Sequence, residues 1–149
     1  RIDVDARLDA IHRPYHAAVR ALLAAKKKKF GMAVLVAAHS MPSTGRGGVA
    51  RADIVPGTQG RTTAATELID VVQAHAEAEG WKVRHDEPYK GGYSTRTYGR
   101  PQAGVHAVQV EIARRLYMDE IRLTPTAGFE RVRTWCAALV EKLGQTALR

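Results

Sequence analysis

His39 and Glu111 are the two residues of this 149-residue chain whose types and settings suit hydrolytic chemistry. His39 ends an apolar run in VLVAAHSMPS (34–43), and Glu111 lies inside a second apolar run, VHAVQVEI (105–112). Imidazole is a neutral ligand for zinc, and a carboxylate beside a metal-bound water can accept its proton. A lone histidine after a strand also serves as a hydrogen-bonded structural residue, so both interpretations of His39 stay open.

The segment that contains Glu111 alternates as a half-buried strand does. Gln109 and Glu111 share one face, and three apolar side chains share the other: Val108, Val110 and Ile112. A carboxylate inside a hydrophobic strand is costly unless it is paired, hydrogen-bonded or bound to a metal. The alternatives to a catalytic role are a salt bridge to Arg114 or Arg115, or exposure on an edge strand.

Two further groups of residues have a chemical and a structural interpretation. His12 and His16 are four residues apart, which places two imidazoles on one helical face. No glutamate lies between them and Pro14 disturbs the turn, so helix packing or a local hydrogen bond is favoured over a metal pair. Cys136, the only cysteine, lies in a helical pattern and is interpreted as a packing residue rather than a nucleophile.

Arginines and glycines gather in the segment PYKGGYSTRTYGRP. Gly91 and Gly92 indicate a loop whose backbone comes close to another group. Arg96 and Arg100 are able to bind a substrate carboxylate, because guanidinium binds carboxylate in a bidentate manner. The alternative is a surface loop with ordinary arginines.

Hydrophobic periodicity predicts the elements that position these residues. Helices are expected at 4–25, 62–79 and 126–144, strands at 32–38, 81–85 and 105–112, and long loops at 41–61 and 86–104. The order predicts a single α/β domain over residues 1–149, with a central mostly parallel or mixed sheet flanked by helices. The continuous apolar run at 32–38 predicts a strand buried on both faces. His39 then lies at the carboxyl end of a strand, where such folds bind ligands.

Composition and charge narrow the classes of partner. The net charge of +8 suits an anionic substrate or nucleic acid. However, the lysines at 26–29 follow a helix without interleaved aromatic residues, so a solvated helix end is favoured and nucleic acid is not expected. No membrane-spanning run or signal peptide is visible, and one cysteine allows no internal disulfide, which together predict a cytoplasmic protein. The oligomeric state is not predicted.

Four segments between residues 11 and 120 resemble the N-formylglutamate amidohydrolase (deformylase) family. In chain order they are PYHAAV, VLVAAHSMPS, ADIVPGTQG and EPYKGGYSTRTYGRPQAGVHAVQVEIARRLYMDE. The resemblance implies a zinc-carboxypeptidase-like (phosphorylase/hydrolase-like) fold. It also implies zinc-dependent hydrolysis of an N-acyl amide, typically N-formylglutamate in histidine catabolism, and therefore a small substrate that carries a carboxylate.

The same resemblance implies roles for five residues of this chain. His39 is expected to be a zinc ligand, and Glu111 the general base that activates the metal-bound water. Arg96 is the candidate for binding the substrate carboxylate. Tyr93 and Ser40 complete the expected substrate-binding set.

The chain also departs from the family pattern. The first two zinc ligands of the family lie upstream of the matched segments, Ala37 stands where aspartate is usual, and Ala113 stands where asparagine is usual. The chain is therefore expected to correspond to the C-terminal part of the family domain and to hold zinc poorly alone, because catalytic zinc uses three protein ligands. The alternative hypothesis is a non-catalytic relative that has lost the zinc site and acts in binding or structure.

Overall fold

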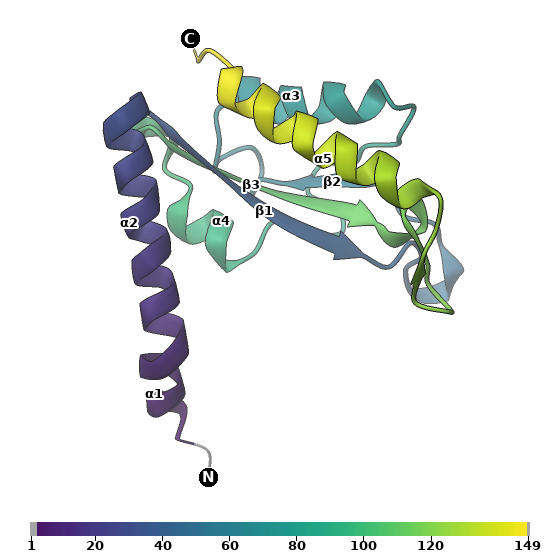
Figure 1. The fold of residues 1–149 in the computed structure, drawn as a ribbon, viewed down its shortest axis with the longest axis horizontal. Coiled ribbons are helices and arrows are strands. Elements are labelled where there is room, and N and C mark those ends of the chain that lie inside the picture. Colours follow the sequence, from purple (N-terminus) through teal and green to yellow (C-terminus); the bar gives the residue numbers. More distant parts are fainter. Residues whose placement is uncertain (1–2, 149) are drawn as a thin grey trace.

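A three-stranded mixed sheet forms the centre of the fold in the computed structural model, which describes residues 3–148 (Figure 1). Its strands are β1 (Ala33–Met41), β2 (Ile54–Gly57) and β3 (Val105–Ala113), in the spatial order β1-β3-β2. β1 runs parallel to β3, and β2 runs antiparallel to it. The strand that carries Glu111 is therefore central, which confirms the expected mixed α/β sheet.

Helices pack on both faces of this sheet. The helices of the fold are α1 (Val4–Arg7), α2 (Arg13–Phe30), α3 (Thr66–Glu77), α4 (Tyr93–Tyr98) and α5 (Gly128–Gln145), and the short strands β4 (Met118–Asp119) and β5 (Thr124–Pro125) precede α5. α3 and α5 lie side by side on one face, and α4 packs on the other (Figure 1). Within the described residues, no helix combines the length and the apolar character needed to cross a bilayer.

The main hydrophobic core lies between the sheet and the pair α3 and α5. The side chains that share the apolar face of β3 are part of it, as their alternation predicts: Val108, Val110 and Ile112. Leu68, Ile69 and Val72 of α3 are fully buried against them. Trp135 of α5 packs on Trp81, with ring centroids 5.2 Å apart. This core leaves the opposite face of β3, with Gln109 and Glu111, to α4 and its loops.

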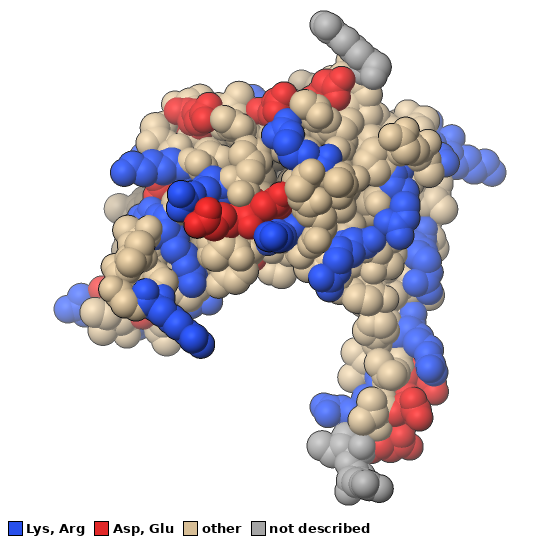
Figure 2. All heavy atoms as spheres, turned by 180° about the vertical axis from the view of Figure 1, so that it is seen from behind, with Lys and Arg blue, Asp and Glu red and all other residues tan. Residues whose placement is uncertain are grey.

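α2 extends away from the body of the protein (Figure 1). A π-helical turn at Leu8–His12 joins it to α1, and Pro14 sits in its first turn, where the missing N–H is tolerated. His16 is the one residue of α2 that is buried. Lys and Arg side chains lie along the helix (Figure 2), and Gly31 in the left-handed region ends it after Lys27–Lys29. The lysine run is thus an exposed helix end, as predicted.

Four predicted elements are wrong in part. Residues 81–85 form a single bridge, from Val83 to Ile54, instead of a strand. The second partner of β3 is β2, which lies in the predicted loop 41–61. The predicted helix at 62–79 begins only at Thr66, and the predicted loop 86–104 contains α4. The periodicity missed β2 because Pro56 and Gly57 are residues that usually interrupt strands.

The first strand also differs from its prediction. β1 pairs only with β3 among the described residues, and its side chains are half-buried from Val34 to Ala37 and exposed from Ala38 to Ser40. It is an edge strand, whereas its continuous apolar sequence predicted burial on both faces. The strand that is buried along nearly its whole length is β3.

Candidate active site

The parallel register of β1 and β3 pairs His39 with Glu111. Side chains at paired positions point to the same face of a sheet, and here His39 Nδ1 lies 3.8 Å from Glu111 Oε1. The Glu111 side chain is 6% exposed, whereas the His39 side chain is 53% exposed. The sheet thus brings an accessible histidine to a buried carboxylate at the carboxyl end of β1.

Gln109 fixes the orientation of this carboxylate. Its Nε2 donates to Glu111 Oε1 at 2.9 Å, and its Oε1 accepts the N–H of Gly92 at 2.9 Å. Gln109 is itself 5% exposed. The sequence placed Gln109 on the same face as Glu111 but gave it no role. The alternation of β3 was the available signal, because a second buried polar side chain two residues away needs partners.

Burial dominates the electrostatics of Glu111. Removal of the carboxylate from water raises its pKa, and His39, Arg51, the Gln109 hydrogen bond and Arg114 oppose that rise. The structural alternatives for Glu111 are wrong within residues 3–148, since β3 is not an edge and Glu111 forms no ion pair with Arg114 or Arg115. Glu111 is thus a buried carboxylate whose hydrogen-bonding partner is a neutral amide.

The Arg114 and Arg115 side chains have other partners. Arg115 Nη2 pairs with Asp53 Oδ1 at 2.6 Å, and Arg114 Nε donates to Ser40 Oγ at 3.5 Å. Arg114 therefore contacts β1, and Arg115 holds the segment before β2.

The glycine-rich loop approaches β2. A Cβ on Gly57 would lie 2.6 Å from the backbone nitrogen of Gly91 and 2.9 Å from the carbonyl oxygen of Tyr89. Gly91 has φ +97°, and a Cβ there would lie 3.1 Å from the carbonyl oxygen of Gly57. Two glycines in contact thus let this loop reach the sheet, so that Gly92 can donate to Gln109.

α4 follows this loop and faces α2 through aromatic rings. The Tyr98 hydroxyl hydrogen-bonds His16 Nδ1, and the Tyr93 ring lies 4.7 Å from His16 and 5.5 Å from His12 between centroids. Burial and the neighbouring His12 lower the pKa of His16. The His12 and His16 pair therefore packs against tyrosines, which agrees with the favoured structural interpretation.

The remaining predicted residues are spread over the two faces. Arg96 is exposed on α4, and its carbonyl accepts from Arg100 Nη1 at 2.8 Å. Ser40 follows His39 and so points to the opposite face, where it lines a hollow with Ile112 and Cys136. Tyr93 lies at the start of α4, on the His39 side of the sheet. The binding roles of these residues remain predictions.

Cys136 is half-buried and packs against the main core, as its helical pattern predicted. Burial raises the pKa of its thiol, which disfavours the thiolate form that a nucleophile requires.

Residues 3–148 hold an incomplete donor set for a metal ion. His39 and Glu111 are close, but residues 3–148 contain no group of three His, Cys, Asp or Glu side chains that could hold a metal ion. Catalytic zinc uses three protein ligands. The described residues alone therefore do not fit a catalytic zinc ion.

The comparisons with known proteins agree on one family. The family model of N-formylglutamate amidohydrolase matches residues 1–118. N-formylglutamate deformylases of Pseudomonas aeruginosa and Pseudomonas putida are 38% and 36% identical over 120 and 118 residues, which is 76% of the chain in each case. These stretches cover 44% and 43% of those relatives, so the chain spans about half the length of the curated relatives that it matches.

Solved structures agree with the sequence comparison. The crystal structure of N-formylglutamate amidohydrolase from Ralstonia eutropha JMP134 superposes with a TM-score of 0.85 at 28% identity, over 96% of this chain and 53% of that one. The gene product Atu2144 from Agrobacterium tumefaciens shares the fold, with a TM-score of 0.68 at 22% identity, over 93% of this chain and 52% of that one.

Proposed function

The chain belongs to the N-formylglutamate amidohydrolase family, and from this premise we propose that it provides the general base of an enzyme that hydrolyses N-formylglutamate. In this reaction water adds to the formyl carbon, the C–N bond breaks, and formate and glutamate are released. The observation that carries the proposal is the buried Glu111 carboxylate beside His39 at the carboxyl end of β1.

Glu111 has the properties that a general base needs. Its pKa is raised by burial, which makes the carboxylate a stronger base near neutral pH. The Gln109 hydrogen bond leaves the second carboxylate oxygen, Oε2, without a described partner and so able to accept a proton from water. The role of Gln109 is positioning, because it touches Glu111 and the α4 loop rather than the reacting atoms.

We also propose that His39 serves as a zinc ligand in the working enzyme, where zinc would lower the pKa of bound water. Because the described residues present only His39 and Glu111 as nearby donors, such a site needs further ligands beyond them. We propose separate roles for the other predicted site residues. Arg96 on α4 would bind the substrate carboxylate, and Tyr93 would line the same pocket. Ser40 stays a predicted substrate-binding residue, although its side chain points to the opposite face of β1. Histidine catabolism in the cytoplasm is the proposed setting.

Formate release tests this function. The complete product of the gene, supplied with zinc, is given N-formylglutamate, and formate and glutamate are quantified together. Equal amounts of both products, lost on chelation and restored by zinc, are the expected result. A complete gene product that releases neither would overturn the proposal and favour a non-catalytic relative.

A further inference from the structure

Arg51 lies in the segment between β1 and β2 and is half-buried. Its Nη1 donates to the carbonyl oxygen of Pro42 and to the Tyr89 hydroxyl, both at 3.1 Å. The guanidinium carbon also lies 5.3 Å from the centre of the Tyr89 ring, within the range of a cation–π contact. None of these partners is a carboxylate, so they fix the position of the guanidinium and leave its positive charge uncompensated.

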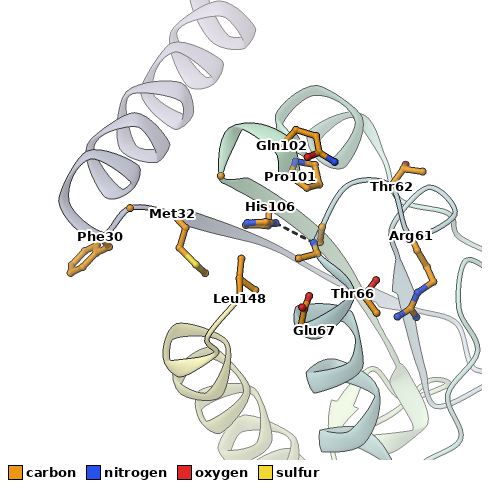
Figure 3. A pocket seen from close by; sticks show the side chains of 14 residues that line it. Phe30, Met32, Arg61, Thr62, Thr66, Glu67, Pro101, Gln102, His106 and Leu148 are labelled. Carbon is orange, nitrogen blue, oxygen red and sulfur yellow. Dashed lines mark hydrogen bonds between the residues drawn. The ribbon is translucent and has the colours of Figure 1, made fainter.

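Other arginines of the fold have acidic partners. Arg115 pairs with Asp53 at 2.6 Å. Near the start of β3, Arg61 lines the hollow drawn in Figure 3 and pairs with Asp70 at 2.5 Å. Arg51 takes part in no ion pair within residues 3–148. A cation that is partly removed from water is costly without a partner, so this position favours an anionic ligand.

Tyr89 places the Arg51 guanidinium on the Glu111 side of the sheet. The Tyr89 side chain packs against a small buried cluster that includes Val55 and Ala113. Val55 is paired with Glu111, and Ala113 follows Glu111 by two positions on β3, so these side chains share one face. Two positions along a strand correspond to ~7 Å. The positive charge of Arg51 also acts on Glu111, where it opposes the rise of the pKa that burial causes.

The guanidinium keeps two nitrogens for a ligand. Nη1 makes both of the hydrogen bonds of Arg51, and Nε and Nη2 make none with the described residues. Nε and Nη2 together can bind the two oxygens of one carboxylate. Gly45 leaves room beside them, because a Cβ at that position would lie 3.7 Å from Nε and 3.9 Å from Nη2.

N-formylglutamate carries two carboxylates, and Arg96 is proposed for only one of them. The α-carboxylate is next to the amide that is cleaved, whereas the side-chain carboxylate lies further from the formyl carbon. A cation about one two-residue step, ~7 Å, from Glu111 matches the more distant carboxylate.

We propose that Arg51 binds the side-chain carboxylate of the substrate and makes the enzyme selective for acidic N-formyl amino acids. This inference rests on the proposed hydrolysis of N-formylglutamate and names a specificity-determining residue for it. Nε and Nη2 of Arg51 donate to the carboxylate oxygens. Tyr89 is a positioning residue, because it contacts the guanidinium and not the substrate.

Selectivity between N-formylglutamate and N-formylglutamine tests this role, because the two substrates have the same shape and differ in the charge of the side chain. Formate release by the complete gene product with zinc gives kcat and KM for each substrate. In Arg51→Gln, the ratio of kcat/KM for N-formylglutamate over N-formylglutamine should fall about 10–100-fold, which is the effect of losing hydrogen bonds to a charged group. The loss should appear in KM for N-formylglutamate, since the contact is remote from the reacting atoms.

Two further variants sharpen the test. Arg51→Lys keeps the charge without the planar fork and should restore part of the ratio. Arg46→Gln is the matched control, because Arg46 is an exposed arginine of the same segment, and it should keep the wild-type ratio.

The ratio separates substrate binding from an indirect effect. If Arg51 acts only through the pKa of Glu111, Arg51→Gln changes both substrates alike, and an unchanged ratio in an active enzyme would overturn the role of Arg51 alone. If Arg51→Gln does not fold, as judged by circular dichroism, Arg51→Lys takes its place: a reduced ratio supports the role, and a wild-type ratio overturns it. A wild type that releases no formate from either substrate would overturn the proposed function, and this inference with it.

Discussion

Replacing Gln109 with leucine tests the support beneath Glu111. Leucine has a similar volume, so the substitution removes hydrogen bonds without opening a large cavity. Two groups then lose their partner: the Glu111 carboxylate and the N–H of Gly92, each now 2.9 Å from Gln109. An unpaired buried group costs about 1–3 kcal/mol, which gives about 2–6 kcal/mol for the pair. That is a large part of the stability of an ordinary domain.

The pH dependence of this loss is a sharper signature. The Gln109 hydrogen bond lowers the pKa of Glu111 against the dominant effect of burial, so the variant should raise this pKa further. An acid whose pKa is higher in the folded state binds more protons there, so its stability falls as pH rises. The difference in stability between wild type and Gln109→Leu should therefore be larger at about pH 7 than at about pH 5.

Urea unfolding followed by circular dichroism measures this difference at both pH values. Gln145→Leu is the matched control, because Gln145 is exposed near the end of α5 and its change should stay within about 0.5 kcal/mol. If Gln109→Leu costs no more than Gln145→Leu, the hydrogen-bonded support of Glu111 is refuted. A pH-independent loss would show instead that only packing was affected.

Three other predictions follow from single features. Gly57→Ala should destabilise the protein by about 1–3 kcal/mol, because the added Cβ meets the Gly91 backbone. Gly144→Ala is the control: its Cβ would point into open space, and the free energy of unfolding should rise by up to about 1 kcal/mol. Thermal unfolding compares the two variants. Burial lowers the pKa of His106, so the free energy of unfolding should decline as pH falls below about 6.5. The decline should be less steep in His106→Leu, and an equal decline in wild type and variant would argue against this role of His106. The 149-residue chain, dialysed after zinc loading, should retain less than one zinc per chain by elemental analysis, and stoichiometric retention would contradict the incomplete donor set around His39.

The parts of the fold that follow from local pattern could be predicted. The alternation of β3 placed Glu111 opposite the apolar face, and the apolar run before His39 placed it at a strand end. The helical periodicity of 126–144 predicted α5, and the first helix was expected at 4–25, whereas α2 continues to Phe30. These features depend on residues close in sequence, where period and capping are direct signals.

Features that depend on distant contacts could not be predicted. β2 has four residues, two of them Pro56 and Gly57, and exists because β3 pairs with it. α4 is a six-residue helix in a segment rich in glycine and β-branched residues, and it is held by the Gly92 bond to Gln109 and by Tyr98 against His16. Local propensity is weak in such segments, and tertiary contacts decide their conformation.

The same distinction explains the candidate site. The approach of His39 to Glu111 requires the β1–β3 register, which no local pattern reports. The structural role of Gly91 could not be predicted either, because its contact partner, Gly57, is far away in the sequence. The residue types indicated hydrolytic chemistry, but the strand register determines which of these side chains lie close together.

The initial rate of formate release by Glu111→Gln tests the central claim most directly. The measurement uses the complete gene product with zinc and N-formylglutamate, and compares Glu111→Gln with Glu130→Gln, which changes an exposed glutamate on α5. Loss of a general base should lower kcat about 10²–10⁴-fold, while Glu130→Gln should retain the wild-type rate. A Glu111→Gln enzyme that turns over at the wild-type rate would contradict the assignment of Glu111 as the base.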